Sequence, residues 1–157
     1  MKSEKAELDP LDSLYSWLRL FLTLLVATAG NAGMWIVILV LPEIQETFSI
    51  NRSSASIPNT LTMIGFGFGN LFFGSIIDRS GAFKVVITAA LLNAIGFYFA
   101  STSTDLITNS FWHLLVGFGT GASFAPLVAD VSLWFRKRRG IAVAIASSGN
   151  YFSGAVW

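Results

Sequence analysis

Long apolar runs separated by short polar segments most constrain what this chain can fold into. A helix of about 20 apolar residues crosses the hydrocarbon core of a bilayer. Charged residues make up only 12% of the chain and apolar residues 54%, whereas soluble domains carry about 25% charged residues. The sequence therefore predicts an all-α, polytopic transmembrane helix bundle. Its predicted spans are residues 18–41, 57–77, 83–100, 111–135 and 140–157, and we expect the fifth to be truncated.

The loops between these runs are too short to separate domains. Residues 1–16 are polar and are predicted to be a cytoplasmic tail, in which Asp9 to Asp12 either begin a short surface helix or belong to a disordered end. Residues 17–157 are predicted to form one incomplete N-terminal bundle. Arg19, at the edge of the first run, is expected to extend its charge to the interface.

Basic residues gather on alternate loops and indicate an orientation. Arg79 and Lys84 lie between the second and third runs, whereas Arg52 is the basic residue on the opposite side. Because cytoplasmic loops carry an excess of Lys and Arg, we expect these loops and the N-terminus in the cytoplasm. The cluster after the fourth run is interpreted first as a topology determinant, and alternatively as an attractor of anionic lipid. It consists of Arg136, Lys137, Arg138 and Arg139.

Several kinds of chemistry find no support in the residues. The chain has no cysteine and one histidine, which excludes disulfides and thiol catalysis and argues against an intramembrane enzyme. His113 lies at the outer edge of the fourth run and is interpreted as an interfacial residue. We expect no metal, no cofactor and no nucleic-acid partner. The bilayer is the predicted environment.

Small residues recur in the second run at an interval that brings helices together. Gly65 and Gly69 form a G-x-x-x-G pair, and Asn70 with Gly74 repeats the spacing. This interval predicts close backbone approach to another helix. The alternative is that membrane helices simply tolerate glycine.

Residues 74–84, Gly-Ser-Ile-Ile-Asp-Arg-Ser-Gly-Ala-Phe-Lys, resemble the signature loop between helices two and three of the major facilitator superfamily. Ala82 stands where a basic residue is usual, which weakens a charge relay built on that position. The resemblance implies the N-terminal part of a major-facilitator fold and a gating role for the loop; the alternative is an ordinary hairpin. Its positions here are Gly74, Asp78, Arg79, Gly81 and Lys84, and Gly81 is expected to permit a tight turn.

Residues 134–154 resemble the helix-four-to-five region of the monocarboxylate transporter and oxalate/formate antiporter branch, and residues 48–56 resemble its bacterial members. Eukaryotic-type monocarboxylate transporters carry an acid in helix one, where this chain has Asn31-Ala-Gly33-Met-Trp35. The resemblance therefore implies a bacterial inner-membrane protein without proton coupling through that helix.

Asp130 is the carboxylate well inside a predicted span, and such acids usually face a cavity or a partner. By resemblance it joins Asp78 in a gating network. The alternatives are a proton carrier, or an interfacial acid paired with Arg136 or Arg138.

Mid-span polar or aromatic residues are candidates for the substrate cavity, although each could alternatively serve only in helix–helix contact. They are Asn31, Trp35, Thr120, Asn150 and Tyr151.

The function these resemblances imply is secondary active transport of a small organic anion, of the monocarboxylate or dicarboxylate type, by alternating access. Its expected partners are that anion, a co-transported proton or an exchanged anion, and the missing C-terminal half of the same chain. The fragment alone is not expected to transport. The alternative is a non-transporting accessory or degenerate membrane protein.

Overall fold

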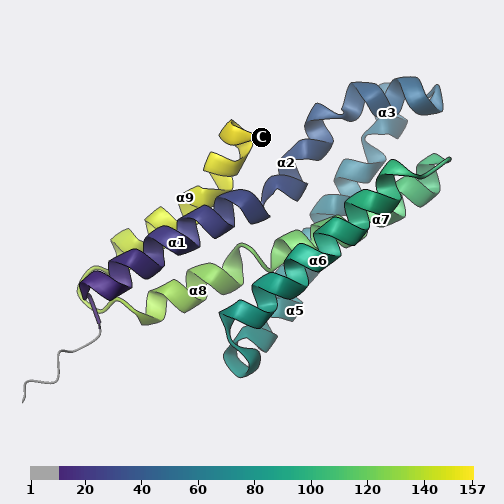
Figure 1. Cartoon of the computed structure of the whole chain (residues 1–157). Coiled ribbons are helices and arrows are strands. Elements are labelled where there is room, and N and C mark those ends of the chain that lie inside the picture. Colours follow the sequence, from purple (N-terminus) through teal and green to yellow (C-terminus); the bar gives the residue numbers. More distant parts are fainter. Residues whose placement is uncertain (1–10) are drawn as a thin grey trace, which may run out of the picture.

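The computed structural model describes residues 11–157, which form helices and no strand (Figure 1). Residues 1–10 lie outside the described residues. The helix α1 begins at Leu14, inside the tail predicted for residues 1–16. The helices are α1 (Leu14–Gly30), α2 (Ala32–Leu39), α3 (Leu41–Phe48), α4 (Arg52–Ala55), α5 (Ile57–Ser80), α6 (Ala82–Ser101), α7 (Leu106–Gly121), α8 (Ala125–Leu133) and α9 (Arg139–Val156).

Four stretches among the described residues are long and apolar enough to cross a membrane. They are Leu14–Leu39, Arg52–Ser80, Ala82–Ser101 and Leu106–Leu133. The fifth predicted run forms α9, which is not one of the four because serine, glycine and asparagine dilute its apolar residues. The predicted all-α membrane fold is confirmed by these helices.

Single residues set several helix boundaries. Asp105 caps α7, because its carboxylate accepts the Thr108 N–H at 2.9 Å. Gly81 is the one residue between α5 and α6, and its φ of +77° lies in a region that favours glycine. The tight turn predicted for Gly81 is therefore confirmed.

Two of the four candidate spans are broken near their middle. The first is interrupted at Asn31, between α1 and α2, and the fourth at residues 122–124, between α7 and α8. Pro126 explains the second break, because it has no N–H to donate and its ring clashes with the preceding turn. At the first break the Asn31 side chain donates to the Ala27 carbonyl, so it competes with the helix backbone.

Glycines bring α5 and α7 into backbone contact. A Cβ added at Gly65 would lie 2.9 Å from the Phe118 nitrogen, and one at Gly69 2.9 Å from the Phe118 carbonyl carbon. The close approach predicted from this pair is confirmed. Gly74, which repeats the spacing, has no neighbouring atom within 4 Å of such a Cβ, so the interpretation fails at that position.

Buried apolar side chains form two separate clusters. One joins α1, α8 and α9 and consists of Leu20, Val131, Phe135, Ala142 and Ala146. The other joins α5, α6 and the end of α7 and consists of Phe73, Ile77, Val85, Ala89 and Ala122. Figure 1 shows the same division, with α1, α8 and α9 alongside one another and α5, α6 and α7 in a second group.

Candidate functional site

An ion pair joins the first and fourth spans. The Arg19 guanidinium donates to both carboxylate oxygens of Asp130, with its closest contact at 2.9 Å. The same guanidinium lies 4.4 Å from the ring centre of Trp134. Asp130 thus pairs with Arg19 and not with Arg136 or Arg138.

Asp78 and Asp130 line one cavity of about 380 Å³ between the end of α5 and α8. Ser132 and Ala129 line the same cavity. Asp78 is exposed and makes no ion pair within residues 11–157. The two carboxylates assigned to gating from the sequence therefore face a common space, in which only Asp130 has a positive partner.

The basic residues of the signature loop are exposed. Arg79 and Lys84 are both on the surface, and Lys84 lines a separate cavity of about 330 Å³ between α5 and α6. Ala82, which stands where a basic residue is usual, packs against the second apolar cluster. An apolar side chain at this position fits its partial burial against that cluster.

Asp12 binds the basic loop between α8 and α9, a contact that sequence reasoning missed. Its carboxylate accepts the backbone N–H groups of Lys137 at 2.8 Å, Arg136 at 3.1 Å and Arg138 at 3.2 Å. Asp12 adopts a left-handed φ of +57° to do so. The Lys137 N–H is the largest of the influences that hold the pKa of Asp12 below its ordinary value. The side chains of residues 136–139 stay exposed.

The two helix breaks meet. Asn31 is fully buried, and its amide donates to Ala27 O at 2.7 Å and to Ser123 O at 3.4 Å, across to the second break. Its side-chain oxygen has no partner. Asn70, on α5, accepts the first N–H of α8, that of Ala125, at 3.0 Å. A polar asparagine inside an apolar span could have marked Asn70 as a contact residue. Its partner Ala125, however, lies 55 residues away, so the contact itself was not predictable.

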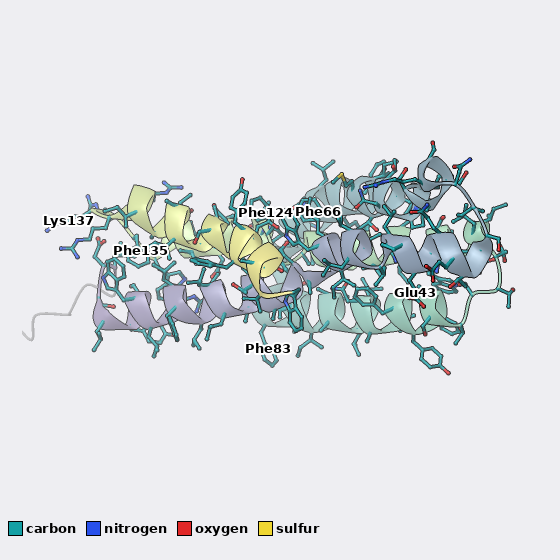
Figure 2. All side chains as sticks on the ribbon, turned by 90° about the horizontal axis from the view of Figure 1, so that it is seen from above. Glu43, Phe66, Phe83, Phe124, Phe135 and Lys137 are labelled. Carbon is teal, nitrogen blue, oxygen red and sulfur yellow. The ribbon has the colours of Figure 1, made fainter. Side chains whose placement is uncertain are left out.

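The second break lies near the middle of the bundle. Phe124, at the break, and Phe66 of α5 have ring centres 6.0 Å apart. Figure 2 shows this pair between the ends marked by Lys137 and Glu43. Unwound backbone thus occurs at mid-length in two spans, where membrane proteins tolerate it only against protein or a water-filled space.

The five cavity candidates do not form one site. Trp35 donates its indole N–H to Asn150 O at 2.9 Å, so α2 and α9 bring these two together. Thr120 is buried and donates to the Asn93 oxygen at 3.1 Å. Tyr151, on α9, is 73% exposed. Asn31 and Thr120 therefore hold helices in place, whereas Asn150 keeps a buried side-chain oxygen without a partner.

His113 is buried and not interfacial, which corrects the sequence interpretation. It is 4% exposed, and its Nδ1 bonds to Asn109 O at 2.9 Å. Its carbonyl accepts the Thr62 hydroxyl of α5 at 3.2 Å.

Within the described part of the chain, no three His, Cys, Asp or Glu side chains are grouped to hold a metal ion.

Known proteins that are similar in sequence to this chain include transporters and an efflux protein. Monocarboxylate transporter 11 of Homo sapiens is 29% identical over 113 residues, which are 71% of this chain and 24% of the relative. The riboflavin transporter MCH5 of Saccharomyces cerevisiae is 31% identical over 54% of this chain and 16% of its own length. The agnestins efflux protein AgnL12 of Paecilomyces divaricatus is 32% identical over 72% of this chain and 27% of its own length.

This chain thus spans about a quarter or less of these relatives. They come from human and fungi, and so give no support to the bacterial inner membrane predicted from the sequence. The sequence pattern of the Major Facilitator Superfamily matches residues 20–156. With its broken apolar spans and its signature loop, this chain belongs to the major facilitator superfamily.

Proposed function

We propose that this chain is part of a secondary transporter that moves a small organic anion across a membrane by alternating access. The observation that carries the proposal is the meeting of two broken spans, at Asn31 and residues 122–124, in the middle of the bundle. Discontinuous helices near the midplane form substrate and ion sites in transporters. Superfamily membership supports transport in place of enzymatic chemistry.

The anionic substrate class is supported by resemblance to the monocarboxylate transporter branch and by the human relative named for monocarboxylate transport. Arg19 is a cation within a described span, and Asp130 neutralises it. We therefore assign the charge that binds the anion to a second half of the transporter, outside this chain. On this chain's side of the substrate cavity, Trp35 contributes an apolar wall and Asn150 a polar group.

Gating is assigned to the cavity shared by Asp78 and Asp130. Because Asp78 has no cationic partner in the described residues, a positive group from the second half enters this cavity in one state and leaves it in the other. The basic loops and the N-terminus face the cytoplasm in this proposal. An exchanged anion or a co-transported proton completes the cycle.

The test is uptake by proteoliposomes that contain the complete transporter of which this chain is part, with small mono- and dicarboxylates as substrates. Asp78→Asn is expected to lower the uptake rate, whereas Glu46→Gln, which changes an exposed acid on α3, leaves it unchanged. Asn150→Ala is expected to raise the half-saturation concentration. Absence of uptake for every carboxylate rejects the substrate class, and wild-type rates for Asp78→Asn reject the gate.

A further inference from the structure

The cavity of about 330 Å³ between α5 and α6 is an open groove along the helix pair. Its inner wall includes Phe73 and Val85, which are both buried, and Phe118 of α7, which packs against them. Both helices are candidate spans, so the open side of the groove lies at membrane depth. The residues of its lining that stay exposed are Phe72, Ser80, Lys84 and Thr88.

The polarity of the lining changes along the groove. Ser80, Lys84 and Thr88 lie toward the turn between α5 and α6, whereas Phe72 and Leu92 lie at the other end. Leu92 follows Lys84 by eight positions, which is about 12 Å along a helix. One leaflet is half of a hydrocarbon core about 30 Å thick. The groove therefore runs from the membrane surface into one leaflet, and its polar and apolar ends follow the order of a phospholipid.

A positive charge distinguishes this groove from other cavities of similar volume. The cavities of about 340 Å³ between α1 and α6 and of about 270 Å³ between α5 and α7 are lined only by uncharged residues. The cavity between α5 and α8 is lined by two acids, Asp78 and Asp130. Lys84 is exposed and makes no ion pair within residues 11–157. The groove thus combines an uncompensated cation with an apolar lining.

These features favour a ligand with a negative head and an apolar chain. An acyl chain fills a groove that opens toward lipid, because an empty void forfeits van der Waals contacts. The chain gains little free energy by the exchange, since the surrounding lipid tails are equally apolar. Selection among lipids therefore depends on the head group, for which the Lys84 ammonium favours a negative charge. The small organic anion proposed as the substrate lacks the chain that matches the apolar end.

We propose that the groove between α5 and α6 binds an anionic phospholipid from the leaflet at the α5–α6 turn. Its phosphate pairs with Lys84, and the Ser80 hydroxyl at the same end supplies a further donor. Its acyl chain lies along Thr88 toward Phe72 and Leu92. This lipid site goes beyond the proposed transport and does not rest on it.

The experiment is photo-cross-linking of a lipid to the complete transporter of which this chain is part, purified in detergent. The probe is a phosphatidylglycerol with a photoreactive group on its acyl chain. Unlabelled phosphatidylglycerol or phosphatidylcholine with the same acyl chains competes with it. Mass spectrometry of the peptides measures the label on residues 72–92 and gives the affinity of each competitor.

Four exposed positions supply the variants. Lys84→Gln removes the cation of the groove and Lys84→Arg keeps it, whereas Lys137→Gln removes a cation of the loop between α8 and α9. Thr88→Trp fills the groove, and Ile87→Trp adds the same bulk beside it, at a position that does not line the groove. Because these positions are exposed, the substitutions leave the buried clusters intact.

The expected result is label on residues 72–92 that phosphatidylglycerol displaces more readily than phosphatidylcholine. Lys84→Gln should lower the affinity for phosphatidylglycerol about five-fold, the effect of one lysine at an anionic membrane surface. Lys84→Arg and Lys137→Gln should leave it near the wild-type value. Thr88→Trp should reduce the label on residues 72–92, and Ile87→Trp should not.

Equal displacement by the two lipids overturns the proposal, and so does an equal loss of affinity in Lys84→Gln and Lys137→Gln, because the charge of Lys84 would then not select the lipid. Label confined to other helices also overturns it, since the groove would then be covered by protein from the rest of the transporter. Because no uptake is measured, failure of the lipid site is distinguishable from failure of the proposed transport.

Discussion

Arg19 and Asp130 are 111 residues apart in the sequence, yet the guanidinium of one donates to both oxygens of the other. Their side chains are 31% and 19% exposed, so water screens the pair only in part. The Trp134 ring beneath the guanidinium fixes its plane. The pair thereby ties the start of the first span to the second half of the fourth.

Replacing Arg19 is expected to destabilise the packing of α1 against α8. Arg19→Gln should lower the free energy of unfolding by about 1.5–3 kcal/mol, because hydrogen bonds to charged groups contribute that much, whereas Arg52→Gln, at an exposed site, should change it little. Arg19→Lys should fall between, since lysine lacks the planar fork. Thermal unfolding in detergent micelles, followed by tryptophan fluorescence, measures these differences. A charge exchange, Arg19→Asp with Asp130→Arg, that restores no stability would contradict the pairing.

Asp12 should confer a pH-dependent stability on the loop between α8 and α9. Because N–H groups of that loop, led by Lys137, lower its pKa, the carboxylate stabilises the fold fully above about pH 4 and loses this effect as the pH falls through the lowered pKa. The difference in melting temperature between wild type and Asp12→Asn should therefore stay constant from neutral pH and shrink in acid. A difference in melting temperature that grows in acid would contradict the stabilising role of the Asp12 carboxylate.

Hydrogen exchange should locate the same contact. In Asp12→Asn the amides of residues 136–138 should exchange faster, because their acceptor loses its charge. Asp105→Asn is the matched variant: its pKa is also lowered, chiefly by the Thr108 N–H, but it should affect only the start of α7. Unchanged exchange at residues 136–138 would show that Asp12 does not hold the loop.

Substitution by alanine should destabilise the bundle at one glycine of this helix pair and leave it unchanged or more stable at another. A Cβ at Gly117 would lie 2.7 Å from the Thr62 carbonyl carbon, so Gly117→Ala should cost about 1–3 kcal/mol by overpacking. A Cβ at Gly67 meets no atom within 4 Å, so Gly67→Ala should be neutral or stabilising, since alanine favours helix. Unfolding in micelles compares them. Equal effects would exclude close packing of α5 on α7.

The hydrogen bond between α5 and α7 should contribute less to the free energy of unfolding than the close packing of these two helices. Thr62 is fully buried, and its hydroxyl lies within hydrogen-bond distance of Pro58 O in its own helix and of His113 O in α7. Thr62→Val removes this donor at nearly constant volume. Interhelical hydrogen bonds in membranes contribute about 0.6 kcal/mol on average. Thr62→Val should thus cost less than Gly117→Ala, and Thr60→Val, at an exposed position of α5, should cost nothing measurable. A larger loss for Thr62→Val would reverse the order of the two effects.

Local patterns predicted the features that depend on neighbouring residues. The apolar runs predicted membrane helices, Gly81 predicted a tight turn, and the spacing of Gly65 and Gly69 predicted a close helix contact. Each needs only helix geometry or one residue's backbone freedom. The residues 74–84 likewise identified the superfamily before any contact was visible.

Contacts between distant segments were not predictable in this way. Nothing near Arg19 indicates Asp130 as its partner, and a polar tail gives no sign that Asp12 reaches the loop after α8. His113 was misplaced because its position at a span's edge says nothing about the face it presents to α5. The break after Gly121 follows from Pro126, but its closure by Asn70 depends on tertiary packing.

The division into two apolar clusters also bears on the order in which the chain is made. Segments from α2 to α7 are consecutive, so their cluster is able to assemble while the C-terminal helices are still on the ribosome. The cluster of α1, α8 and α9 forms only after α8 and α9 have been synthesised, because α1 precedes them by the whole α2–α7 segment. During that interval Arg19 enters the bilayer without its acid, and α1 depends on water, lipid head groups or the translocon until Asp130 is synthesised.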